Sequence, residues 1–133
     1  MKPLPYSIFH LSTPALLFLI GLLGYPLIEL LWRGRTHWTM GLAGGLAMVL
    51  LLWISRTHLP LPLMWGLGAL AITTVEFAIG YVVNLKLHWG VWDYSALPLN
   101  IAGQICLPFT VIWFFLSIPG IALCQYLERI SPL

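Results

Sequence analysis

The chain has 133 residues, of which 60% are hydrophobic and only 8% carry a formal charge, and its net charge is +2. A soluble domain usually has about 25% charged residues. This composition therefore excludes a soluble enzyme, a disordered chain and a nucleic-acid-binding protein. The solvent that suits such a surface is membrane lipid. At roughly 20 residues for each spanning helix, the length suffices for about four of them with short loops.

Four apolar runs predict an all-α membrane protein, a single transmembrane domain over residues 1–133 with four transmembrane helices in two hairpins. The spans are expected at about 11–32, 39–54, 62–85 and 99–126. The fourth run contains Pro108 and Pro119, which lack the backbone N–H that a helix interior needs, so we expect the last helix to be kinked or broken there.

The orientation in the membrane depends on how the basic residues are counted. Three basic residues are expected on each side, with Lys2 on the side of the N-terminus, so the positive-inside rule alone gives no orientation. If Arg33 belongs to a site instead of a loop, the remaining charges favour a cytoplasmic N-terminus.

Two carboxylates fall inside apolar runs, where a charge costs about 2.5 kcal/mol or more. Glu29 lies about one turn inside the end of the first span. Glu76 lies about nine residues from the end of the third span, or roughly 13 Å along a helix. A glutamate side chain cannot reach the interface from that depth. Each acid is therefore expected to be paired, solvated or functional.

Helical spacing suggests which polar side chains share a face. Glu29 and Arg33 are four residues apart, with the acid in the favoured N-terminal position for an ion pair. Glu76 lies on a stripe of small and polar residues that should face other helices. The topology brings these and other polar groups to one membrane face. We expect a polar pocket there, open to that face and formed by Glu29, Arg33, Arg35, His37, Glu76, Asn84, Trp92, Asp93, Tyr94, Asn100 and Gln104.

Structural explanations stay open for several of these residues. Glu29 and Arg33 could be an ion pair that only holds two helices together, and Arg35 and His37 could be simple loop residues. Asp93, in the sequence Trp-Asp-Tyr-Ser, could cap a turn. The sequence has no HxxH or ExxH spacing among the candidate ligands, so we expect no metal site and no cofactor.

Four motifs carry a resemblance to a known family. They are GYPLIE at 24–29, RGRTHWTMG at 33–41, TVEF at 74–77 and WDYSALPLNIAGQIC at 92–106. In this order they resemble the small polytopic membrane proteins of the putative ABC-transporter type IV, permease-like family, over nearly the whole chain. Many members carry an arginine where this chain has Gln104, which removes one positive charge from the expected pocket. The resemblance implies a permease-like protein, which we expect in a bacterial cytoplasmic membrane.

The sequence contains no GxxxxGK followed by Ser or Thr, the loop that binds ATP phosphates in many ATPases. We therefore do not expect this chain to hydrolyse ATP by that route. Any ATP-driven role requires a separate ATPase subunit.

Three functions fit these observations. The first is a transporter or transporter subunit, in which Glu29 and Glu76 bind a cation or exchange protons. Four short helices form a small translocation unit, so this function implies a homo-oligomer or a larger membrane complex. We favour it over the other two.

The second function is an intramembrane enzyme that uses acid–base chemistry on a lipid headgroup. Arg33 and Arg35 would hold a phosphate, while Glu76 or Asp93 acts as general acid or base. No serine or cysteine has an evident activating partner, so we lean against an enzyme. The third is a structural or partner-binding membrane subunit, in which the charges only lock helices together.

Overall fold

The computed structural model describes residues 12–130. Lys2 and the expected start of the first span at Leu11 lie outside these residues. The described chain forms the helices α1 (Thr13–Arg33), α2 (Trp38–Ser55), α3 (Leu61–Gly80) and α4 (Leu107–Ile130), and α3 continues directly into a π-helix, η1 (Tyr81–Lys86).

Four helical segments are long and apolar enough to cross a membrane: α1, α2, α3 with η1, and α4. Within residues 12–130 there is no β-strand, only an isolated bridge between Ile101 and Ile105. The expected all-helical class with four membrane-spanning segments is confirmed.

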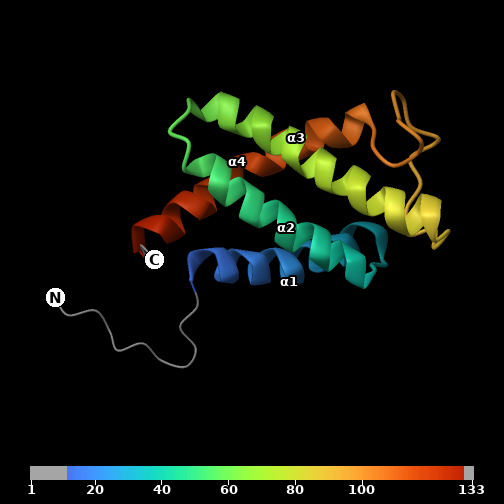
Figure 1. Cartoon of the computed structure of the whole chain (residues 1–133), viewed down its shortest axis with the longest axis horizontal. Coiled ribbons are helices and arrows are strands. Elements are labelled where there is room, and N and C mark those ends of the chain that lie inside the picture. The colour runs from blue at the N-terminus through green and yellow to red at the C-terminus, as the bar shows by residue number, and fades with distance from the viewer. Residues whose placement is uncertain (1–11, 131–133) are drawn as a thin grey trace.

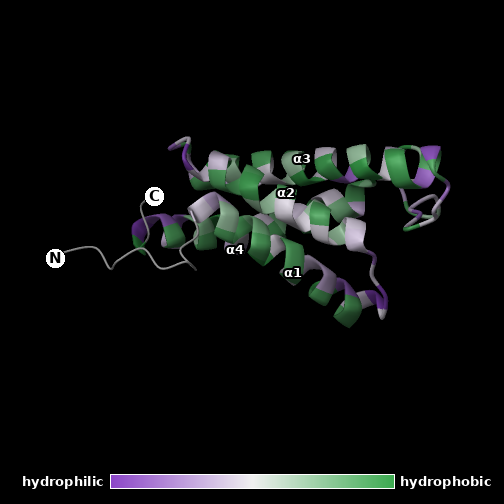
Figure 2. Ribbon diagram, turned by 60° about the horizontal axis from the view of Figure 1, so that its bottom comes forward, coloured by the Kyte–Doolittle hydropathy of each residue, from purple (hydrophilic) through white to green (hydrophobic). Residues whose placement is uncertain are grey.

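The helix α2 lies at the centre of the bundle and contacts each of the other three (Figure 1). The helix α1 packs along α2, and α3 packs along α4, whereas α1 and α4 make far fewer contacts with each other. The α1–α2 turn and the segment 87–106 lie at one end of the bundle, opposite the α2–α3 turn. Figure 2 shows hydrophilic residues gathered at the two ends and apolar residues along the helices between them.

The close approach of α1 and α2 depends on two glycines. A Cβ atom on Gly21 would lie 2.1 Å from the carbonyl oxygen of Gly44, and one on Gly44 would lie 2.3 Å from the carbonyl oxygen of Gly21. No other residue fits at this crossing without moving a helix. Small residues at such crossings allow the backbones of spanning helices to pack directly.

The fourth span begins later than the expected residue 99, because α4 starts at Leu107. The residues before it form a loop, in which Leu99 and Ala102 have φ angles of 53° and 54° that a right-handed helix excludes. The side chain of Asn100 donates to the carbonyl oxygen of Leu97 at 2.9 Å and so holds the loop in its non-helical path. A polar side chain that bonds nearby backbone groups competes with helix formation.

The two prolines of the fourth span have different positions. Pro108 is the second residue of α4, where a missing N–H removes no helical hydrogen bond. Pro119 lies inside α4, which continues through it to Ile130. The helix is therefore not broken at either proline, and a kink at Pro119 stays a prediction.

Candidate functional site

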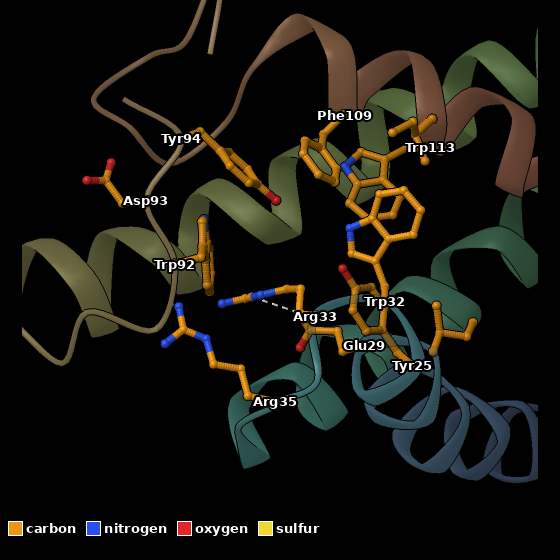
Figure 3. Close-up of a pocket in the computed structure, with 12 residues that line it drawn as sticks. Tyr25, Glu29, Trp32, Arg33, Arg35, Trp92, Asp93, Tyr94, Phe109 and Trp113 are labelled. Atoms are coloured by element: carbon orange, nitrogen blue, oxygen red, sulfur yellow. Dashed lines mark hydrogen bonds and ion pairs between the residues drawn. The ribbon is translucent and has the colours of Figure 1, made fainter. Parts of the chain in front are cut away.

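A cavity of about 390 Å³ lies in the gap between α1 and α4, beneath the segment that joins η1 to α4. Half of its lining residues are aromatic, and the charged side chains of Glu29, Arg33 and Arg35 lie at its α1 side (Figure 3). Its lining residues are Tyr25, Ile28, Glu29, Trp32, Arg33, Arg35, Trp92, Asp93, Tyr94, Phe109, Ile112 and Trp113.

The first carboxylate of the cavity is held by two partners. Glu29 is 6% exposed, and its Oε2 accepts a hydrogen bond from Nη1 of Arg33 at 2.8 Å (Figure 3). Its Oε1 accepts from the hydroxyl of Thr36 at 3.1 Å. Nη2 of Arg33 donates to the carbonyl oxygen of Val91 at 3.0 Å. The ion pair expected from the four-residue spacing is therefore present, and Arg33 also ties the end of α1 to the segment 87–106.

The second carboxylate comes from α3 and has an unused acceptor. Glu76 is 8% exposed, and its Oε2 accepts from the hydroxyl of Tyr94 at 3.3 Å. Its Oε1 is buried and has no hydrogen-bond partner among residues 12–130. The indole of Trp113 lies near this carboxylate but does not reach hydrogen-bonding geometry with it.

Glu29 and Glu76 line one smaller cavity of about 20 Å³, together with Arg33, Tyr25 and Tyr94. That volume accommodates about one water molecule. The two acids thus come from different helices and meet at a common enclosed space. The juxtaposition gives a place where a proton or a small polar group can be bound between two carboxylates.

Tyr94 lies outside the spanning helices, in the segment 87–106, and closes the cavity over Glu76. Its ring stacks on Phe109 of α4 with a centroid distance of 4.7 Å and an interplanar angle of 12°. Burial raises the pKa of Tyr94 well above its ordinary range, and the nearby Glu76 carboxylate raises it further. The phenol therefore keeps its proton at physiological pH and can donate the hydrogen bond to Oε2 of Glu76.

Three of the expected pocket residues hold the segment 87–106 in place and do not line the 390 Å³ cavity. Asn84, in the π-helix η1, donates from Nδ2 to Oε1 of Gln104 at 2.8 Å and accepts from the backbone N–H of Val91 at 2.7 Å. The indole N–H of Trp92 donates to the carbonyl oxygen of Gln104 at 3.0 Å. Asn84 and Gln104 thereby position Trp92 and the Val91 carbonyl that Arg33 contacts. Asn100 has a comparable role inside the loop, where it accepts from Gly103 N–H at 3.1 Å.

The remaining expected residues divide between cavity and turn. Arg35 lines the large cavity, is exposed, and makes no hydrogen bond or ion pair with the described part of the chain. Asp93 also lines it, but its Oδ1 accepts from Ser95 N–H at 2.8 Å, and Figure 3 shows its carboxylate pointing away from Arg33 and Arg35. His37 caps α2 through Thr39 N–H and lines a neighbouring cavity of about 170 Å³.

The sequence interpretation missed much of the apolar wall. Phe109 and Trp113, four residues apart on α4, line the cavity with Trp32 of α1. The spacing of the two aromatic residues on α4 was a usable signal, but the fourth apolar run has no charged residue near them. Thr36 was also missed, although it donates to Glu29.

Among residues 12–130 there is no group of three or more His, Cys, Asp or Glu side chains that could hold a metal ion. Burial raises the pKa of Cys106 above its ordinary value, so its thiol stays protonated and is a poor nucleophile at neutral pH.

A family model described as "Putative ABC-transporter type IV" matches residues 39–130. The chain belongs to this family. No curated protein and no solved structure matches it. With four helices that can cross a membrane, the chain is a small integral membrane protein of a transporter-type family. The matched segment contains Glu76, Trp92 and Tyr94, whereas Glu29 and Arg33 lie before it on α1.

Proposed function

We propose that this protein is the membrane subunit of a transport complex and that the cavity between α1 and α4 binds the molecule that is moved. The observation that carries the proposal is the meeting of Glu29 and Glu76 at one enclosed space with Arg33 and Tyr94. A buried acid costs several kcal/mol in a membrane span. Two acids that only held helices together would be expected to use all their acceptors, but Glu76 Oε1 is unused.

The geometry supports binding and proton exchange more than catalysis on a lipid. Arg33 is already engaged by Glu29 and the Val91 carbonyl, and Asp93 points away from both arginines. Glu76 keeps one oxygen free to accept a proton or a donor group of a bound molecule. Tyr94 fixes the other oxygen. This arrangement presents one acceptor at the 20 Å³ cavity, which shares Tyr25, Glu29 and Arg33 with the 390 Å³ cavity.

The complex needs further subunits. Four short helices form a small translocation unit, and the sequence has no ATP-binding loop of the GxxxxGK type. The proposal therefore includes a separate ATPase subunit and either a second copy of this chain or another membrane protein. It also includes a bacterial cytoplasmic membrane with the N-terminus on the cytoplasmic side.

The test uses the full tagged chain, purified in mild detergent from its native membranes with its bound subunits and reconstituted in proteoliposomes. We expect ATP hydrolysis in this preparation and a loss of about tenfold in Glu76→Gln, equivalent to about 1.4 kcal/mol. Glutamine keeps the shape of Glu76 and can still accept from Tyr94, so the fold is preserved.

Glu128→Gln is the matched control. It makes the same chemical change in α4, on an acid that pairs with Arg56 at the opposite end of the bundle. We expect this variant to keep the hydrolysis rate. The absence of ATP hydrolysis from the reconstituted preparation would contradict the proposal, and so would equal losses in the two variants.

A further inference from the structure

A second cavity, of about 240 Å³, lies deeper in the same gap between α1 and α4. Its walls are almost entirely apolar and include Ile20 and Gly24 of α1 and Leu116 of α4, with α2 beneath them. It shares Tyr25 and Ile28 with the 390 Å³ cavity. The two cavities are therefore parts of one groove, which has a charged end and an apolar end.

The groove faces hydrocarbon and not the interior of the bundle. Ile28 is 53% exposed and Ile112, across the gap on α4, is 42% exposed. From Ile20 to Arg33 the helix α1 rises roughly 20 Å at 1.5 Å per residue, out of about 30 Å for the whole of α1. The groove thus runs from near the middle of the bilayer to one headgroup layer, a distance that matches one leaflet.

The charged end of the groove has a free cation at headgroup depth. Arg35 makes no ion pair within residues 12–130, and Figure 3 shows it reaching toward Trp92 beside Arg33. Glu29 neutralises Arg33, and the Asp93 carboxylate points away. Arg35 is therefore the charged group on this side of the cavity that has no counter-ion among residues 12–130, and it suits an anion. Arginine binds phosphate oxygens through several N–H groups in a fixed plane.

We propose that the two cavities form a single site for an anionic phospholipid, whose phosphate lies at Arg35 and whose acyl chain lies in the apolar groove between α1 and α4. This inference rests on the proposed function, because it takes the same cavity and names the class of molecule bound there. Continuity of the two cavities and the charge at Arg35 favour a lipid over a helix of a second copy. A helix in the groove would bring no anion to Arg35, except from an acid of its own.

The binding test places the purified full chain in nanodiscs that contain phosphatidylglycerol and phosphatidylcholine with identical acyl chains. Native mass spectrometry then measures which lipid stays bound after release from the disc. We expect the wild-type protein to retain phosphatidylglycerol in preference to phosphatidylcholine by about tenfold, the effect of one charged hydrogen bond. Glycerol phosphate alone supplies the headgroup without a chain, and we expect it not to displace the lipid at equal concentration.

Two variants test the two ends of the site. Arg35→Gln should lose the preference for the anionic lipid and retain both lipids equally. Gly24→Leu fills the groove, since a Cβ on Gly24 meets no atom within 4 Å, and should reduce retention of the anionic lipid by about tenfold. Gly66→Leu in α3 is the matched control, because its Cβ also meets no atom within 4 Å but it lies outside the groove. It should leave retention unchanged.

Several outcomes would overturn the inference. Equal retention in Gly24→Leu and Gly66→Leu would show that the groove holds no chain. Displacement of the lipid by glycerol phosphate would show a free-phosphate site. If Gly24→Leu dissociates a dimer without changing lipid retention, the groove is an interface between copies.

The lipid site and the transport function can fail separately. Anionic lipid bound by a preparation that lacks ATP hydrolysis would sustain this inference while contradicting the transport function.

Discussion

Replacement of Arg33 by methionine should destabilise the protein through the acid that it leaves behind. In the wild-type structure Glu29 is 6% exposed, and without Arg33 its one remaining side-chain partner among residues 12–130 is Thr36, whose hydroxyl donates to it at 3.1 Å. Breaking a buried ion pair by removing one partner costs about 3–5 kcal/mol. Because the Arg33 side chain is 25% exposed, water weakens the pair, and we expect a loss of about 2–3 kcal/mol in the free energy of unfolding.

The double variant separates the stranded charge from lost packing. When Glu29→Met is combined with Arg33→Met, no uncompensated carboxylate remains, and the double variant should cost no more than the Arg33 variant alone. The double-mutant cycle then gives a coupling energy of about 2 kcal/mol. Reversible unfolding in mixed micelles, followed by circular dichroism, measures each free energy. Additive costs, within about 0.5 kcal/mol, would refute the claim that the two side chains depend on each other.

Two further predictions concern the contacts that hold the segment 87–106 and the helices α1 and α2 in place. Asn84→Ala removes the hydrogen bonds to Gln104 and to the Val91 N–H. We therefore expect the amide hydrogens of the segment 87–106 to exchange about tenfold faster, as measured by mass spectrometry of peptides. Unchanged exchange in this segment would contradict the positioning role of Asn84. Gly44→Ala places a Cβ atom 2.3 Å from the Gly21 carbonyl oxygen and should lower the free energy of unfolding by more than about 2 kcal/mol. Gly66→Ala, where the Cβ meets no atom within 4 Å, should instead raise it by about 0.5–1 kcal/mol. Thermal unfolding of both variants measures the contrast, and equal melting temperatures would argue against a direct backbone crossing.

The spans and the ion pair between Glu29 and Arg33 could be predicted because they depend on local sequence. Apolar run length sets the number of helices, and a spacing of four residues sets the contact between Glu29 and Arg33. The start of α4 could not be found this way, since Leu99 to Cys106 is as apolar as a helix. Only the left-handed backbone at Leu99 and Ala102, stabilised by the loop, shows that the helix has not begun.

The sequence also could not show which polar residues line the cavity and which hold the segment 87–106 in place. Asn84 and Gln104 are polar residues at the same end of the bundle as the cavity, so the sequence pattern predicted that they line the pocket. Their side chains contact each other and the loop backbone instead. The direction of a polar side chain in a π-helix or an irregular loop depends on long-range packing. No periodic spacing in the sequence predicts that direction. For the same reason the Val91 carbonyl, a backbone partner of Arg33, could not be foreseen.

Few contacts join the two sides of the site. The helix α1 is fixed to α2 at the Gly21–Gly44 crossing and makes few contacts with α4, among them the ring contact of Tyr25 with Trp113 at 5.9 Å. At its polar end, the hydrogen bond from Arg33 to the Val91 carbonyl joins α1 to the segment 87–106. Arg33 makes this bond with Nη2 while Nη1 neutralises Glu29. An anion that drew Arg33 toward Arg35 would weaken both bonds together. Binding of an anion beside Arg35 would therefore remove one contact of the segment 87–106, whereas the hydrogen bond of Trp92 to Gln104 and the stacking of Tyr94 on Phe109 would remain.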